Sequence, residues 1–316
     1  MTAAAELLAA FSQRIVDAAF GVETVVRDLV IVTVARGHVL LQGVPGIGKT
    51  LLARAYTRAR GGHFERVQGT ADLLPSDLTG VHILTGASNE FVLRPGPLFG
   101  DVVLIDEINR SGPKTQSALL QAMEERAVAL DRKIYPLAAD FMVIATQNPY
   151  EFEGTFPLPE SQLDRFLLLI EMSYPAPAAE RAVLTTYDQP DSNYPDRLAA
   201  ITTVPTELLI AARAEAAAVH VAPALYDYAL AIAAATRSHP QISLGLSTRG
   251  LLALMRCARV AACMNERDFV SPDDIKSLTS ACIAHRLVLA PEATLEGLSA
   301  RAVLADVLTQ VAVPRA

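Results

Sequence analysis

Short apolar runs alternate with helix-like segments between about residue 20 and residue 175. Five of these runs are strongly apolar or β-prone, which is typical of strands. They are 38–42 (HVLLQ), 63–67 (HFERV), 102–105 (VVLI), 141–146 (FMVIAT) and 166–170 (FLLLI). Because each run is followed by a helical pattern or a turn signal, the sequence predicts a doubly wound α/β fold around a parallel sheet.

Two pairs of shorter β-prone runs predict hairpins inserted into this core. The segment 81–99 (VHILTGASNEFVLRPGPLF) holds two runs around residues 86–89 and ends in a Pro-Gly-Pro breaker. Residues 128–130 and 134–137 flank the tripeptide 131–133, directly before the run 141–146. We expect both hairpins to project from the core.

The pattern changes to alanine- and leucine-rich helical spacing after the breaker at 174–177, and we expect no further strand there. One helix should begin at 271–274 (SPDD), with a capping serine, a first-turn proline and two carboxylates facing the helix dipole. Another should begin at 245–249 (GLSTR). The predicted organisation is an α/β core over 1–176, with an amphipathic helix at its N-terminus, and a smaller all-α domain over 177–316.

Composition supports a folded chain of this size and disfavours some partners. The 316 residues are 51% hydrophobic and carry a net charge of −7, which suits two packed domains and opposes non-specific binding to polyanions. No stretch approaches about 20 consecutive apolar residues, and the N-terminus lacks the pattern of a signal peptide. We therefore expect no membrane span and a cytoplasmic location. A nucleic-acid partner is the minority hypothesis, because it would need a local basic patch.

Cysteine and histidine give no sign of a metal centre. Cys257, Cys263 and Cys282 lack C-x-x-C spacing, so buried free thiols are expected in place of a disulfide framework or a zinc site. The six histidines are scattered singly. We predict no histidine-based metal site.

The strongest chemical signal is the segment 43–50 (GVPGIGKT), which matches G-x-x-x-x-G-K-[ST] between a predicted strand and a helix. Glycines at these positions let backbone amides turn toward phosphate oxygens at the positive end of the next helix. Lys49 would neutralise the β- and γ-phosphates, and Thr50 would supply a hydroxyl to Mg²⁺. A glycine-rich turn without a ligand is the alternative, but the strand-loop-helix setting argues against it.

An acidic pair follows the run 102–105, where a parallel sheet opens toward a nucleotide. We predict that Asp106 holds the metal and that Glu107 is the base that activates the attacking water. An Asp-Glu pair in this place can also be a helix cap. The phosphate-loop motif upstream favours the catalytic interpretation.

Three further residues are candidates for contact with the γ-phosphate. Asn148 follows the run 141–146 and can donate and accept hydrogen bonds, although a turn asparagine before Pro149 is also possible. Arg165 precedes another strand and is a candidate arginine finger for a neighbouring subunit. Arg249 starts a helix of the second domain and is a candidate for closing over the nucleotide. For either arginine alone, a surface salt bridge is the default interpretation.

Five elements in this order, GVPGIGKT, VVLIDE, ATQNP, LDRF and GLSTRG, resemble those of AAA+ ATPases over nearly the whole chain. The segments LIDEINRSGPKTQSALLQAMEER, LRPGPLF and FPLPESQLDRF resemble the MoxR family more narrowly. The resemblance implies a P-loop NTPase core with hairpin insertions and a helical lid domain, which binds ATP and Mg²⁺. It makes Glu107 the hydrolytic residue, Asn148 sensor 1, Arg165 the arginine finger and Arg249 sensor 2. The implied nucleotide-binding residues are Gly43, Val44, Pro45, Gly46, Ile47, Gly48, Lys49, Thr50, Leu51, Asp106, Asn148 and Arg249, of which Thr50 and Asp106 hold the metal and Lys49 also serves catalysis.

The resemblance further implies a homo-oligomeric ring, usually a hexamer, with both hairpins facing the pore or substrate. Family members are thought to act as chaperones on client proteins, beside a partner with a von Willebrand factor A domain. This chain departs from its relatives at Phe20-Gly21-Val22, where they commonly carry a Gly-Gln pair, so contacts to adenine are not assigned.

Three other functions are compatible with the same fold. A nucleic-acid motor would use Arg132 and Lys133 at a hairpin tip, but the acidic balance argues against it. An ATPase subunit of a magnesium chelatase is a weaker resemblance. A scaffold that binds nucleotide without turnover would not need Glu107.

Overall fold

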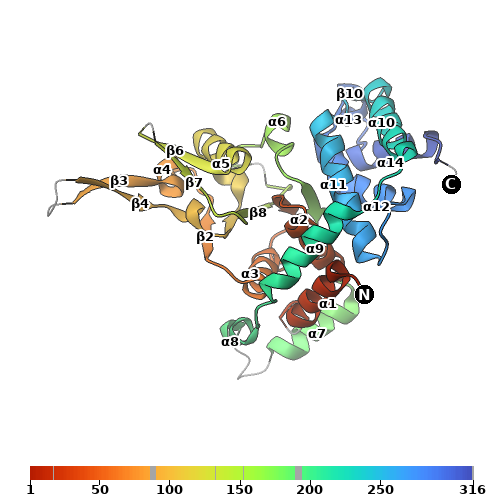
Figure 1. The fold of residues 1–316 in the computed structure, drawn as a ribbon. Helices are drawn as coiled ribbons and strands as arrows, with labels where there is room; N and C mark the ends of the chain where they lie inside the picture. The colour runs from red at the N-terminus through yellow and green to blue at the C-terminus, as the bar shows by residue number, and fades with distance from the viewer. Residues whose placement is uncertain (17, 86–89, 132, 152, 189–193, 315–316) are drawn as a thin grey trace.

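The computed structural model describes residues 1–316 apart from 17, 86–89, 132, 152, 189–193 and 315–316 (Figure 1). Its α-helices are α1 (Ala3–Ile15), α2 (Glu23–Val34), α3 (Lys49–Arg60), α4 (Pro75–Thr79), α5 (Pro113–Glu125), α6 (Glu160–Leu163), α7 (Pro177–Tyr187), α8 (Tyr194–Ala200), α9 (Thr206–Ala218), α10 (Pro223–Ser238), α11 (Thr248–Met264), α12 (Pro272–Ile283), α13 (Pro291–Leu295) and α14 (Ala300–Gln310). Its strands are β1 (Val39–Gln42), β2 (Phe64–Gln68), β3 (Gly80–Thr85), β4 (Glu90–Pro95), β5 (Val102–Asp106), β6 (Ala127–Leu130), β7 (Lys133–Pro136), β8 (Met142–Gln147), β9 (Leu168–Glu171), β10 (Ile242–Leu244) and β11 (Val288–Leu289). Short 3₁₀ turns are η1 (Pro97–Phe99), η2 (Ile108–Arg110) and η3 (Ala284–Arg286).

The central sheet is built from the five strands that the sequence predicts. They pair in parallel in the order β2-β5-β8-β1-β9, and each begins and ends within two residues of its predicted range. This order places β1, β8 and β5 side by side, so the loops after these strands meet at one edge. The predicted doubly wound α/β core is confirmed.

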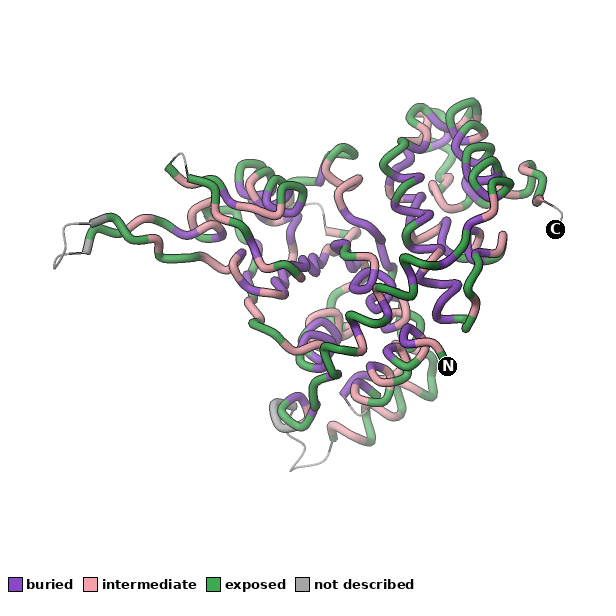
Figure 2. Tube along the Cα trace, in the orientation of Figure 1, coloured by how far each residue is buried: buried purple, intermediate pink, exposed green. Residues whose placement is uncertain are grey.

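Alternate residues of each strand bury against different sets of helices, as the pleat of a strand requires. Val39 and Leu41 belong to a large apolar cluster with α1, α2, α3 and the C-terminal helices. Leu40 belongs to a second cluster, with α5 and the base of the hairpins. Buried residues accordingly run through the sheet and along the inner faces of the helices (Figure 2).

Both predicted hairpins are present and extend away from the sheet (Figure 1). In the first, β3 pairs antiparallel with β4, and in the second β6 pairs antiparallel with β7. The turn at 86–89 and Arg132 lie outside the described residues. His82 of β3 joins the two hairpins, because its Nδ1 lies 2.6 Å from Asp131 Oδ2 and its Nε2 lies 2.9 Å from the Tyr135 hydroxyl.

The chain after residue 176 is mainly helical, and its helices begin where capping chemistry predicts. Ser271 and Asp274 form a reciprocal capping box at α12, and Ser247 accepts a hydrogen bond from Gly250 N at the start of α11. The prediction that no strand follows is wrong in one respect, because β10 and β11 form a small antiparallel pair. Strands of three and two residues are too short to produce an alternating pattern.

The helical part packs closely against the core. Helix α9 contacts α1 and α2, and α11 contacts the same two helices, within one continuous apolar cluster. The predicted N-terminal helix is α1, which buries Leu7, Phe11 and Ile15 on one face. Among the described residues, no helix is both long and apolar enough to cross a bilayer. The three cysteines are buried and free.

Candidate functional site

The loop between β1 and α3 has a backbone shape that its glycines make possible. Gly46 and Gly48 have φ angles of +80° and +86°, a region that other L-residues adopt only with strain. A side-chain carbon added to either would meet no described atom within 4 Å. At Gly43 the same carbon would lie 2.5 Å from the Met172 carbonyl oxygen, so a side chain is excluded there by contact. Open space therefore lies in front of Gly46 and Gly48.

Lys49, the first residue of α3, folds back over this loop. Its Nζ donates hydrogen bonds to the carbonyl oxygens of Gly43 at 2.6 Å and Val44 at 2.7 Å. Desolvation lowers the pKa of Lys49, and the charges of Glu107 and Asp106 oppose this shift. The ammonium group is thus held at the loop by carbonyls that an anionic ligand would have to outcompete.

Thr50 and Asp106 meet although they are far apart in sequence. Asp106 ends β5, is only 3% exposed, and accepts a hydrogen bond from the Thr50 hydroxyl at 3.0 Å. Thr146 of β8 donates to the same oxygen of Asp106 at 3.1 Å. Arg66 of β2 holds the other oxygen through two nitrogens at 2.9 and 2.8 Å.

A hydroxyl beside a buried carboxylate is a donor set that Mg²⁺ accepts when phosphate oxygens and water complete the shell. The residues therefore fit the predicted metal, for which Thr50 and Asp106 would be the protein ligands. Sequence reasoning missed Arg66 and Thr146. Both lie on strands that neighbour β5, so only the strand order could have found them.

Glu107 follows Asp106 in a left-handed backbone conformation, with φ 55° and ψ 54°. Its carboxylate accepts a hydrogen bond from Gln68 Nε2 at 2.9 Å. It also forms an ion pair with Arg110, whose Nε lies 2.9 Å away, and its side chain remains 41% exposed. Glu107 occupies the N-cap position of η2 but makes no side-chain cap bond. The carboxylate thus engages neighbouring side chains in place of capping the turn.

Asn148 lies just beyond β8 and is 9% exposed. Its Oδ1 accepts a hydrogen bond from Tyr150 N at 3.2 Å, so it forms the turn that the alternative interpretation expects. It also lines the same pocket as Lys49, Thr50, Asp106 and Glu107, which has a volume of about 430 Å³. The turn fixes the side chain at the pocket wall.

The two predicted arginines lie elsewhere, and they lie together. Neither Arg165 nor Arg249 lines the pocket at the loop. Arg165 Nε donates to Glu124 Oε2 at 2.8 Å, and Arg249 Nη2 donates to Glu124 Oε1. Both arginines are thus engaged by Glu124, and neither lines the phosphate pocket of its own chain.

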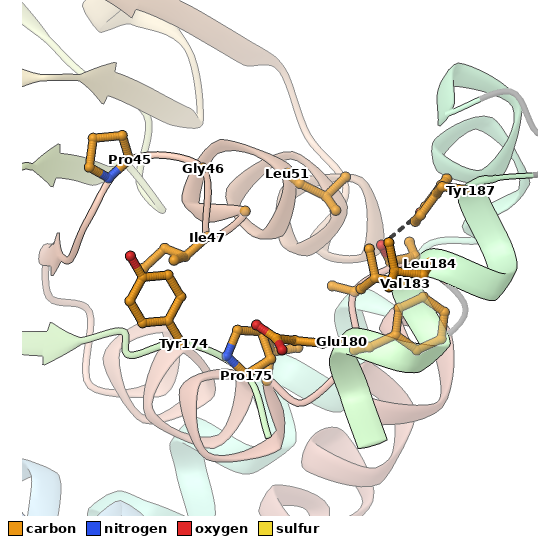
Figure 3. Close-up of a pocket in the computed structure, with 15 residues that line it drawn as sticks. Pro45, Gly46, Ile47, Leu51, Tyr174, Pro175, Glu180, Val183, Leu184 and Tyr187 are labelled. Carbon is orange, nitrogen blue, oxygen red and sulfur yellow. Dashed lines mark hydrogen bonds between the residues drawn. The ribbon is translucent and has the colours of Figure 1, made fainter. Parts of the chain in front are cut away.

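A second, more apolar pocket of about 530 Å³ adjoins the loop on its other side (Figure 3). Pro45, Gly46 and Ile47 form one wall, and Val183, Leu184 and Tyr187 of α7 face them. The Tyr187 hydroxyl donates to the Ala18 carbonyl oxygen at 3.2 Å, which ties α7 to the turn before α2. The lining residues are Ala18, Ala19, Phe20, Val22, Pro45, Gly46, Ile47, Gly48, Leu51, Tyr174, Pro175, Glu180, Val183, Leu184 and Tyr187.

Phe20 and Val22 both line the apolar pocket. They belong to the turn between α1 and α2 and not to a helix. Sequence reasoning missed the contribution of α7. Its apolar spacing resembles that of any packed helix, so no signal marked it.

Comparison with known proteins agrees with this architecture. The family model for the ATPase family associated with various cellular activities (AAA) matches residues 38–168, and an AAA lid domain model matches residues 234–307. Chaperone MoxR1 of Mycobacterium tuberculosis is 37% identical over 93% of this chain and 79% of its own length. Protein MoxR of Methylorubrum extorquens is 35% identical over 90% of this chain and 88% of its own.

The chain belongs to the MoxR family of AAA+ ATPases. YeaC of Bacillus subtilis is a further relative, 46% identical over 91% of this chain and 90% of its own. A crystal structure of a candidate ATPase from Cytophaga hutchinsonii superposes with a TM-score of 0.88 at 35% identity, covering 99% of this chain and 96% of that one. These matches confirm the MoxR resemblance and the P-loop core with a helical lid.

Proposed function

We propose that this MoxR protein hydrolyses ATP with Mg²⁺ and uses the energy to remodel client proteins. The observation that carries the proposal is the meeting of the phosphate loop, the Thr50–Asp106 pair, Glu107 and Asn148 around one pocket of about 430 Å³. Loop, acidic pair and polar residue come from β1, β5 and β8, which are neighbours in the sheet. Family membership supports an ATPase.

Each residue has a role that its position supports. The loop at Gly46 and Gly48 cradles the phosphates, while Lys49 exchanges its carbonyl partners for phosphate oxygens. Thr50 and Asp106 would hold Mg²⁺, which when bound would supply positive charge to the phosphates. Glu107 accepts the proton of the attacking water after Gln68 and Arg110 release its carboxylate.

The apolar pocket suits a purine base. It shares Pro45, Gly46, Gly48 and Leu51 with the phosphate pocket, so one ligand can reach both. A planar, largely apolar ring matches walls of Val183, Leu184 and Tyr187 (Figure 3). In this proposal Phe20 and Val22 take the place of the Gly-Gln pair of relatives.

Arg165 and Arg249 act on a nucleotide in the adjacent subunit of a ring. Their absence from the lining of their own phosphate pocket supports action in trans for both. An arginine supplied by a neighbour couples hydrolysis to assembly, which is how AAA+ rings would pass strain between subunits. We take a hexamer, the usual family assembly, as the expected size.

The hairpins β3–β4 and β6–β7 are the proposed client-contacting elements. Phe91 and Ile134 are exposed apolar side chains on them, at 73% and 76%. Exposed apolar groups on projecting hairpins suit transient contact with protein chains. A partner with a von Willebrand factor A domain remains part of this proposal, as does the division of the chain into a core over 1–176 and a lid over 177–316.

The decisive experiment replaces Glu107 with Gln, which removes the proton acceptor while keeping the side-chain shape. ATP affinity should stay near the wild-type value, while turnover falls by about 10²–10⁴-fold. The matched control is Glu125→Gln, since Glu125 lies on the exposed face of α5 and contacts Gln121. Unchanged turnover in Glu107→Gln would remove this residue from the mechanism.

A further inference from the structure

The carboxylate of Glu124 binds Arg165 and Arg249, the two arginines that we propose act on the nucleotide of the neighbouring subunit. Glu124 lies in the last turn of α5 and uses one oxygen for Arg165 and the other for Arg249. In Figure 1, α6, which precedes Arg165, lies between α5 and α11, which carries Arg249. Three segments far apart in sequence thus converge on a single side chain.

A second acid, Asp164, and a third arginine, Arg286, lie beside the cluster around Glu124. Asp164 accepts a hydrogen bond from Arg286 Nε at 2.7 Å, and its other oxygen lies 4.0 Å from Arg249 Nε. Hydrogen bonds from Arg165 and Arg249 lower the pKa of Glu124 below its ordinary value. Three guanidinium groups and two carboxylates leave one net positive charge, which suits an approaching phosphate.

The contact with Glu124 leaves the two terminal nitrogens of Arg165 available for a phosphate. Glu124 contacts Arg165 at Nε, on the side of the guanidinium group. Within the described residues, no hydrogen bond engages the two terminal nitrogens of Arg165. A guanidinium group held at Nε can still present both terminal nitrogens to a phosphate.

We propose that Glu124 is a positioning residue that holds Arg165 and Arg249 as one pair, aimed at the nucleotide of the adjacent subunit. It orients both guanidinium groups before the interface forms, so less side-chain freedom is lost when they meet phosphate. The inference rests on the proposed function, because it assigns Glu124 a role only if Arg165 acts in trans.

Glu124→Gln tests the idea with little change in shape. The amide keeps one acceptor oxygen but turns a donor toward the second arginine, so the pair can no longer be held together. In the assembled protein, kcat should fall by about 10- to 100-fold, the range that misplacement of a catalytic group produces. ATP affinity should not change, because Glu124 does not line the phosphate pocket. Glu125→Gln, one residue further along α5, should behave as wild type.

Mixing experiments separate positioning in trans from a structural effect. Glu124→Gln subunits have an intact pocket, while Glu107→Gln subunits have an intact arginine pair. A random equal mixture should reach about a quarter of wild-type turnover, the share of interfaces that combine the two intact parts in a head-to-tail ring. Either variant alone should stay well below this value. A fold defect in Glu124→Gln would not be rescued by mixing.

The outcomes distinguish this inference from the function on which it rests. If Arg165→Ala keeps full turnover in the assembly, the trans role itself fails. If Arg165→Ala loses turnover while Glu124→Gln keeps it, only the positioning role is refuted. If Glu124→Gln is impaired but mixing with Glu107→Gln restores nothing, Glu124 acts within its own subunit and the proposal is wrong.

Discussion

Asp28 carries a charge that the folded state disfavours, so removing this charge should raise the free energy of unfolding. It lies on α2 with a side chain that is 13% exposed, and Arg27 Nη1 is 3.8 Å from its Oδ1. Burial raises the pKa of Asp28 from 3.8 to about 6, and the charge of Arg27 opposes the shift only in part. Above pH 6 the ionised carboxylate therefore destabilises the folded state relative to the unfolded chain.

The size of the effect follows from the pKa difference. A rise from 3.8 to about 6 corresponds to at most about 3 kcal/mol at 1.36 kcal/mol per pH unit. Because solvent and side chains relax around the charge, we expect Asp28→Asn to raise the free energy of unfolding by about 1–3 kcal/mol at pH 7.5. The gain should shrink as the pH falls from 6 toward 4, since the folded-state carboxyl becomes protonated and then resembles the amide.

Urea denaturation at pH 7.5 and at pH 4, followed by circular dichroism, measures both values. Asp227→Asn, on the exposed face of α10, is the control for loss of a charge alone. Equal stability of Asp28→Asn and wild type at pH 7.5 would contradict the argument. A gain of the same size at pH 4 would also contradict it, because the charge could not then be its cause.

Two further predictions concern the site. Arg165→Ala should leave ATP binding by a subunit unchanged and lower turnover of the assembly by about 10³-fold or more. Mixing Arg165→Ala with Glu107→Gln subunits should restore part of the turnover, and no recovery would refute action in trans. Val183→Asp places a charge in the apolar pocket and should weaken ATP binding about tenfold or more, measured by calorimetry, whereas Thr185→Asp on the exposed side of α7 should not. Equal ATP affinity of the two α7 variants would show that the base does not bind in the apolar pocket.

The sequence alone predicted the features whose cause is local. The runs of β5 and β8 are apolar on both faces because helices cover both sides of the sheet, and this leaves a clear pattern. The loop at 43–50 needs left-handed glycines at fixed spacing, so its motif encodes its shape. Both hairpins follow from β-prone pairs around turn residues.

What the sequence could not predict depends on contacts between distant segments. Gln68 and Arg66 reach Glu107 and Asp106 because β2 pairs with β5, and nothing in their own spacing shows it. Arg249 was expected to close over the nucleotide, but its partner Glu124 is 125 positions away in sequence, and only the folded structure brings the two side chains together. Where Arg249 acts stays a prediction.

His82 connects the two hairpins through side-chain hydrogen bonds. Its ring is hydrogen-bonded to Asp131 and Tyr135 of the second hairpin, while its backbone is in β3 of the first. We therefore expect a force on one hairpin to be shared with the other. The first hairpin is followed by β5, which ends at Asp106, and the second by β8, which is followed by Asn148. If clients bind the hairpins as proposed, a pull on a bound chain would reach two walls of the phosphate pocket at the same time.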